Sequence, residues 1–291
     1  RHHLLRQRRG VHNHGVLPAC LSHQGHGAIG TSALRQRGID AAGCRLIGRV
    51  RGQTRVRREL QHDRESYRFV RPGNPAHDQL SHEGFGAPFA NTGLIWSGFR
   101  PSDDGCKLPF LIPANAHLVV VLEWLSDAAL EFGKRDLAKR SRKLAKSVRR
   151  AIKKYAIVGQ GPDKKYAYEV DGLGNSLEWD DPNVPSLLAL PYLGWCGLGD
   201  RRYLQTRNWI LSRHNPMYVS GKFATGLASV HTPARHIWPL ALAIQGLTAW
   251  SYDESAACLE LLESIDGGTG RNHESVNVDD PNEFTREWFS W

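Results

Sequence analysis

The sequence predicts an all-α protein that is built from pairs of helices. Apolar residues recur at helical spacing in several long segments, and no sustained two-residue alternation indicates an extended β-sheet. The connections between the helical segments are long and mix aromatic, acidic and amide side chains. These observations apply to residues 67–291, because the first 66 residues have a different composition.

Residues 1–66 contain 13 Arg, no Lys, half of the 14 His and no Trp, Tyr or Phe. Their net charge of 13 − 4 = +9 equals the formal charge of the whole protein. Such a segment buries little apolar surface, so disorder is the default expectation. Three interpretations compete: an Arg-rich arm for nucleic acid, a disordered tail and, the one that we favour, a message read in a non-native frame. We therefore divide the chain into residues 1–66 and a folded segment, 67–291.

Two long helices come first in the folded segment. Apolar residues such as Leu118 and Leu122 share one helical face in a segment of about 113–132, and the pattern continues over about 135–157. The segment Lys134–Lys154 also carries eleven basic side chains and one acidic one. We interpret it as a solvated outer face, because no aromatic residues interleave with the charges to stack on bases.

Further helices are predicted at about 183–195, 201–213, 233–250, 253–265 and 283–290. Only short strands are compatible with the pattern, for example at 166–170. The string Asp-Asp-Pro-Asn occurs at 180–183 and again at 279–282, each time at the start of a predicted helix. Asp at the N-cap with Pro in the first turn is a common start signal, so we favour a capping role for both strings.

Four connections between helices are rich in aromatic, acidic and amide side chains. They span residues 93–107, 166–183, 215–238 and 266–282. Every second connection in an array of helix hairpins emerges at the same end, so the four connections are expected to line one concave face. Aromatic rings stack on the C–H surfaces of sugars, while carboxylates and amides pair with hydroxyl groups. The composition of this face therefore indicates a carbohydrate ligand.

Two acidic sites have no structural explanation in the sequence. Asp103 and Asp104 lie between Ser102 and a glycine, without the proline that follows the other acidic pairs. Glu274 follows a glycine-rich turn that allows the backbone to approach a ligand closely. Cleavage of a glycosidic bond needs one protonated acid and one ionised carboxylate, and two separate loops could supply them.

Other function classes find little support. His231 and His236 are five residues apart, which is not the i, i+4 spacing of a metal site on one helix face. The five cysteines form no C-x-x-C arrangement, and no dinucleotide fingerprint or paired base for a serine nucleophile is present. We predict no metal and no cofactor. No apolar run reaches membrane-spanning length and no secretory leader is visible, so we predict no membrane partner and a cytoplasmic location.

Several strings together resemble a known family. They are TGLIWSGFRPSDD at 92–104, IPAN at 112–115, YAYEVDGLGN at 166–175, DDPNVPSLLALPYLG at 180–194, NPMYVSG at 215–221, HTPARHIWPLALAIQGLT at 231–248, DGGTGRNHESVNVDDP at 266–281 and TREWFSW at 285–291. Their order and approximate spacing are similar to those of glycoside hydrolase family 125, over about residues 67–291.

The resemblance implies an (α/α)6 barrel and a metal-independent, exo-acting α-1,6-mannosidase that hydrolyses its substrate with inversion. The family's general acid is an Asp of the RPSDD motif and its general base is the Glu of the HES motif. These roles fall on Asp103, or alternatively Asp104, and on Glu274. The implied ligand is a mannose-containing oligosaccharide, such as an α-1,6-linked mannan or an N-glycan fragment, and no nucleic acid.

Motif position and residue type also indicate substrate-binding residues, which are Trp96, Arg100, Asp104, Asp171, Asn183, His231 and His273. Alternatives stay open for three of them. Arg100 is compatible with a structural ion pair, Trp96 with the core, and His231 with a helix start.

We expect the chain to be incomplete relative to the family. About seven predicted helices do not close a barrel of twelve, and no WLRD-type motif precedes Trp96. A remnant that at most binds sugar is therefore the main alternative to an active mannosidase. An α-glucosidase on a similar barrel is a second alternative.

Overall fold

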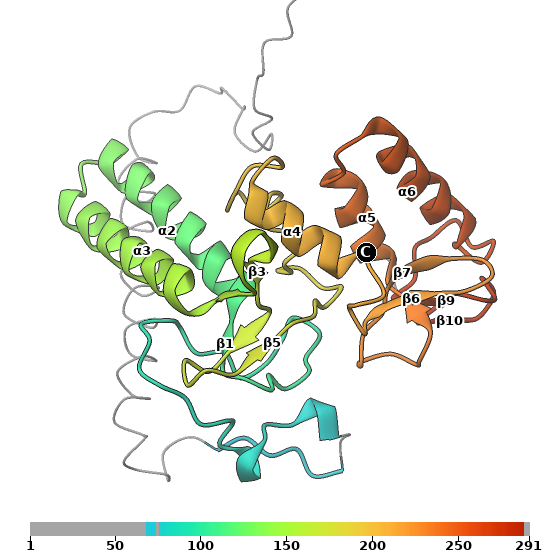
Figure 1. Ribbon diagram of the computed structural model, residues 1–291, viewed down its shortest axis with the longest axis horizontal. Helices are drawn as coiled ribbons and strands as arrows, with labels where there is room; N and C mark the ends of the chain where they lie inside the picture. The colour runs from blue at the N-terminus through green and yellow to red at the C-terminus, as the bar shows by residue number, and fades with distance from the viewer. Residues whose placement is uncertain (1–67, 74–75, 288–291) are drawn as a thin grey trace, which may run out of the picture.

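The computed structural model describes residues 68–73 and 76–287. These residues form five α-helices, labelled α2 to α6, and ten strands of only two or three residues each. Figure 1 shows a green hairpin of α2 and α3 at one end of the molecule and a red hairpin of α5 and α6 at the other, with α4 between them. The segment 1–66, about which we predict disorder or a non-native frame, lies outside the described residues.

Helices α2 (Ile112–Glu131) and α3 (Arg135–Tyr155) confirm the first two predicted helices. Helix α2 begins with Pro113 in its first turn, where the missing N–H group costs no helical hydrogen bond. Apolar faces of both helices pack together, and their outer faces are joined by ion pairs such as Arg149–Glu123 at 2.9 Å. Because this pair is partly exposed, packing rather than charge holds the hairpin together.

Three shorter helices follow. Helix α4 (Arg201–Ile210) begins at Asp200, whose carboxylate accepts the Tyr203 N–H at 2.9 Å, and α6 (Tyr252–Ser264) begins at Ser251, which accepts the Glu254 N–H at 3.2 Å. These side chains satisfy amides that have no partner within the helix. Helix α5 (Pro239–Leu247) is shorter than the predicted 233–250, because the residues before it form a turn and a strand.

The helix predicted at 183–195 is wrong. Residues 183–196 form a series of turns in which Pro185 and Pro191 lack the N–H that a helix needs, and Gly194 has a positive φ of 79°. Leucines of this segment are nevertheless fully buried in the core. The apolar pattern therefore reflected the burial of an irregular segment.

The helix predicted at 283–290 is also wrong in the part that is described, because Phe284–Thr285 forms strand β10. Residues 288–291 lie outside the described part. The capping roles of the two Asp-Asp-Pro-Asn strings are wrong as well. Asp180 accepts the N–H groups of Leu187 and Leu188 at 2.8 and 2.9 Å, and Asp279 pairs with Arg235.

The strands pair antiparallel in four small sheets, and short 3-10 turns occur at η1 (Ala76–Asp78), η2 (His82–Gly84) and η3 (Gly161–Asp163). The sheets are β1 (Phe110–Leu111) with β4 (Glu169–Val170) and β5 (Ser176–Leu177); β2 (Ile157–Val158) with β3 (Lys165–Tyr166); β6 (Tyr218–Ser220) with β7 (Thr225–Leu227); and β8 (His236–Ile237) with β9 (Ser275–Asn277) and β10. Strands β3 and β4 confirm the short extended pieces predicted at 166–170.

The core is formed by one large apolar cluster around α2, α3 and the 187–195 turns, and by a smaller one between β8, β9 and α6. Most of the regular secondary structure in the described residues is thus helical, as predicted. Their five α-helices are fewer than the twelve of an (α/α)6 barrel, so the barrel stays a prediction. In the described part of the chain, no helix is both long and apolar enough to cross a bilayer.

Candidate active site

The RPSDD motif folds into a tight turn. The Asp103 N–H donates to the Arg100 carbonyl at 3.1 Å, and the Arg100 N–H donates to the Asp104 carbonyl at 2.8 Å. Asp103 lies at the tip with a φ of 69°, a left-handed conformation that Asp tolerates better than most residues. Its side chain is exposed, whereas Asp104 is fully buried with 0 % exposure. The turn therefore places two adjacent carboxylates in opposite environments.

Gly105 explains how the turn is anchored. A Cβ atom at this position would lie 2.1 Å from the Gln79 carbonyl oxygen, so only glycine allows the approach. The Gly105 N–H also donates to the His77 carbonyl at 2.6 Å. The segment that contains η1 is thereby held against the turn, and His77 comes close to Asp104.

Asp104 belongs to a ring of polar contacts that joins three loops. Ser102 Oγ lies 2.6 Å from Asp104 Oδ2 and 3.2 Å from Asp181 Oδ2. Ser229 Oγ lies 3.5 Å from the same Asp181 oxygen and accepts the His231 N–H at 3.2 Å. His231 Nδ1 completes the ring at 3.5 Å from Asp104 Oδ1. We call these five residues the Asp104 ring.

Two of the ring residues, Asp104 and Asp181, are buried acids that share a single hydroxyl group. The Ser102 hydroxyl has one proton to donate, so its second carboxylate contact requires a proton on the acid. Burial raises the pKa of Asp181, and the charge of Asp104 raises it further, against the lowering contacts from Asn183. These surroundings favour the protonated form of Asp181 more than water does.

Glu274 lies directly before β9 and is 5 % exposed. Its Oε2 atom accepts the Thr285 hydroxyl at 3.1 Å and lies 3.2 Å from Arg286 Nε. A hydroxyl donor and a guanidinium group are contacts that stabilise a negative charge. The two contacts also fix the orientation of the Glu274 carboxylate.

His231 lies beside Asp104 and is also influenced by the charge of Glu274. The adjacent Asp104 carboxylate raises the pKa of His231 against the opposing effect of burial, and the charges of Glu274 and Asp78 raise it further. Glu274 therefore lies within electrostatic reach of the Asp104 ring. The sheet of β8 and β9 brings the two loops near each other. The loop that carries His231 leads into β8, and β8 pairs with β9, which follows Glu274, through His236 and Asn277.

The other predicted binding residues do not belong to the Asp104 ring. Arg100 is buried and its Nε donates to Glu169 at 2.6 Å, which matches the structural ion pair left open above. Trp96 is half-buried and packs against the core, where its ring covers Gly98 so closely that a Cβ there would lie 2.7 Å from it.

Asp171 and Asn183 are buried and engaged within their own loops, and His273 is buried against strand β10. Asp171 accepts the N–H groups of Leu173 and Asn175, and Asn183 donates to Asp181 at 3.1 Å. His273 stacks on Phe284 with ring centroids 3.8 Å apart. These contacts shape the loops that carry the acids.

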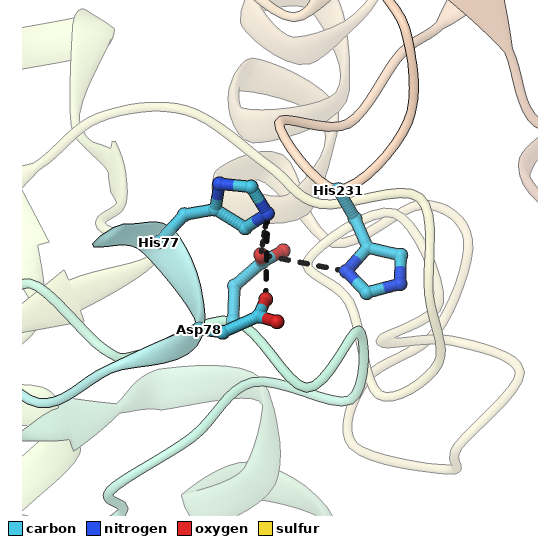
Figure 2. A group of neighbouring side chains, drawn as sticks. His77, Asp78 and His231 are labelled. Carbon is cyan, nitrogen blue, oxygen red and sulfur yellow. Dashed lines mark ion pairs between the residues drawn. The ribbon is translucent and has the colours of Figure 1, made fainter. Parts of the chain in front are cut away.

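Sequence reasoning missed several residues at the site. Asp181 was interpreted as part of a cap. Ser102 carried no signal beyond its position in the RPSDD motif, and Ser229 none beyond its position in the connection 215–238. His77 and Asp78 had none, because they lie in a segment without motifs. Together with Asp104 and His231 they form a group whose ligand atoms lie within 4.8 Å of one another. Figure 2 shows His77 and Asp78 on the same turn and His231 facing them from a separate loop.

Carboxylates at loops between helices are the side chains that enzymes commonly use to cleave glycosides. The chain belongs to glycoside hydrolase family 125, the metal-independent α-mannosidases, whose family model matches residues 21–291. The matched range begins earlier than the resemblance described above, which starts at about residue 67.

Two related proteins support this family membership. One is a solved structure of a metal-independent α-mannosidase from Streptococcus pneumoniae, in a non-productive substrate complex with α-1,6-mannobiose. Its sequence is 44% identical to this chain, and the two structures match with a TM-score of 0.80. The match includes 86% of this chain and 58% of the pneumococcal chain. The meiotically up-regulated gene 157 protein of Schizosaccharomyces pombe is 43% identical over 228 residues, which are 77% of this chain and 45% of that protein. The chain thus spans about half the length of these relatives.

Proposed function

We propose that this protein is an exo-acting α-mannosidase that hydrolyses terminal α-1,6-linked mannose with inversion. The observation that carries the proposal is the Asp104 ring, which joins the RPSDD turn to the loops of Asp181 and His231, with Glu274 in electrostatic reach. Family membership supports the mannoside, and the α-1,6-mannobiose bound to the pneumococcal relative supports the linkage.

Asp103 is the proposed general acid, because an acid must touch the glycosidic oxygen and its side chain is exposed at the tip of the turn. It gives its proton to that oxygen as the bond to the anomeric carbon breaks. Glu274 is the proposed general base, which takes a proton from the water that attacks the opposite face. Inversion requires the two carboxyl groups to be about 6.5–9.5 Å apart, with this water between them.

The seven predicted substrate-binding residues differ in how exposed their side chains are. His231 and Trp96 are partly exposed, so we propose that they contact the sugar directly. The other five, Arg100, Asp104, Asp171, Asn183 and His273, are buried, and we propose that they position the loops. No step of the proposed mechanism needs a metal or a cofactor.

The first test is hydrolysis of α-1,6-mannobiose and of an aryl α-mannoside by the purified chain and by Glu274→Gln. Removal of the base is expected to lower kcat by about 10²–10⁴-fold, the usual contribution of a general base. Glu260→Gln on the exposed side of α6 is the matched control and should retain full activity.

The first sugar released should be β-mannose, as NMR of the fresh product would show, because inversion changes the anomer. Equal activity of Glu274→Gln and the parent would remove Glu274 from the mechanism. Binding of mannobiose without turnover by the parent chain would favour the sugar-binding remnant, and preference for an α-glucoside would favour the glucosidase.

A further inference from the structure

The RPSDD turn is the tip of a longer loop that is shaped like a hairpin. Phe99 pairs antiparallel with Gly105 directly outside the turn, so one leg of the loop enters the turn and the other leaves it. We call residues 98–108 the acid hairpin, because the proposed acid Asp103 lies at its exposed tip. The place of this carboxyl group in the site therefore depends on how both legs are held.

A single carboxylate, that of Glu169, contacts both legs of the acid hairpin. On the first leg, Arg100 Nε donates to Glu169 Oε1 at 2.6 Å. On the second leg, the N–H groups of Lys107 and Leu108 both donate to Glu169 Oε2 at 2.9 Å. Because the two oxygens belong to one planar group, their hydrogen bonds fix the position of each leg relative to the other.

Glu169 is itself held in place by the sheet. It lies on β4, the central strand, where it is paired with Leu111 of β1 and Leu177 of β5. Its side chain is 0 % exposed. A buried carboxylate is costly unless donors surround it, and the three N–H groups of the acid hairpin are such donors. These contacts therefore join the hairpin to the sheet.

Trp179 contacts the same two legs from a separate segment. Arg100 Cζ lies 4.9 Å and Lys107 Nζ 4.8 Å from the centre of its ring, so each leg places a cation near one aromatic group. Such contacts bring the legs together but depend less on direction than hydrogen bonds do. The direction of the acid hairpin is therefore determined mainly by Glu169.

We propose that Glu169 positions the general acid, an inference that rests on the proposed function of Asp103. By joining both legs of the acid hairpin to β4, its carboxylate presents the Asp103 carboxyl group at a fixed place beside the glycosidic oxygen. A misplacement of about 1 Å can lower a rate by about 10²-fold. Because its side chain is fully buried, Glu169 acts through the hairpin and not on the sugar.

The test compares two α-mannosides that differ in their need for an acid. The sugar hydroxyl that leaves α-1,6-mannobiose needs a proton, whereas dinitrophenolate leaves as a stable anion. Glu169→Gln replaces one acceptor oxygen by an NH2 group and so disconnects at least one leg. We expect kcat to fall by about 10²-fold on mannobiose but by less than about 3-fold on dinitrophenyl α-mannoside, with KM nearly unchanged. A merely structural role would lower both rates by the same factor.

Two further variants complete the comparison. Glu178→Gln is the matched control, because Glu178 forms an ion pair with Lys165 at 2.8 Å outside the acid hairpin, and it should keep both rates. Arg100→Met combined with Glu169→Gln removes the ion pair without leaving a buried charge unpaired, and so remains informative if the single variant misfolds. The double variant should show the same selective loss on mannobiose.

Hydrogen exchange provides a measurement that needs no hydrolysis. In Glu169→Gln, the amides of residues 100–108 should exchange at least about 10-fold faster than in the parent, whereas those of α3 should not change. Equal losses on both mannosides, full activity on mannobiose, or unchanged exchange in the hairpin would overturn the proposal. A parent chain that hydrolyses neither mannoside would overturn the proposed function instead, while the exchange result would still decide whether Glu169 holds the hairpin.

Discussion

Asp103 and Asp104 are neighbours in sequence but occupy different environments. The tight turn directs Asp103 to solvent, whereas Asp104 is buried between Ser102 and His231. The sequence alone did not distinguish the two, because both belong to the same motif. Burial now separates a residue that a substrate can reach from a residue that other side chains cover.

We predict that Asp103→Asn lowers kcat by about 10²–10⁴-fold on an aryl α-mannoside and leaves the free energy of unfolding nearly unchanged, because it removes only a proton donor at an exposed site. Asp104→Asn is expected to destabilise the fold by roughly 1–3 kcal/mol, because a buried carboxylate partner of Ser102 is lost. Kinetics and urea unfolding of both variants measure the difference.

Asp163→Asn, an exposed substitution in η3, serves as the control and should change neither quantity. The opposite outcome, an active Asp103→Asn and a stable but inactive Asp104→Asn, would transfer the acid role to Asp104.

At the scale of elements, the segment 180–196 shows how an irregular stretch is held in place. Asp180 is fully buried and accepts the N–H groups of Leu187 and Leu188, which belong to turns and have no helical partners. Its carboxylate therefore replaces the hydrogen bonds that a helix would have provided. The leucines of the segment fill the core between α2 and α4.

This arrangement predicts a pH-dependent stability. Burial raises the pKa of Asp180 from 3.8 to about 8, although the amides of Leu187 and Leu188 oppose the change. The folded state therefore keeps a proton that the unfolded chain has released. The free energy of unfolding should decrease as pH rises from about 4 to about 8, by at most about 1.4 kcal/mol per pH unit for one proton.

Urea unfolding at several pH values measures this slope, and Asp180→Asn should reduce it, because the amide does not titrate. Asp181 contributes with the same sign, so part of the slope should remain. An identical slope in the parent and Asp180→Asn would contradict the assignment.

At the scale of the whole molecule, the sequence predicted best the elements that local periodicity determines. The α2–α3 hairpin was anticipated to within a few residues, because both helices carry long regular apolar faces. The segment 183–196 was not, since its leucines mimic a helix while its prolines prevent one. Burial alone does not determine secondary structure.

The candidate site, too, was predictable only where local sequence motifs determine it. The motifs indicated Asp103, Glu274 and His231, but the Asp104 ring depends on contacts between residues far apart in the sequence, such as Asp104 with His231 and Ser102 with Asp181, which are 79 positions apart. The group around His77 likewise depends on the close approach of η1 to Gly105. Such contacts arise from tertiary packing, which a single sequence does not display.

The central claim is that an aspartate of the RPSDD turn and Glu274 face each other across one bound mannoside. A crystal structure of Glu274→Gln with α-1,6-mannobiose would test it most directly. We predict that the carboxyl group of Asp103 and the amide group at position 274 lie about 6.5–9.5 Å apart, on either side of the anomeric carbon. A mannobiose bound away from both residues, or the two side chains facing different cavities, would contradict the proposed mechanism.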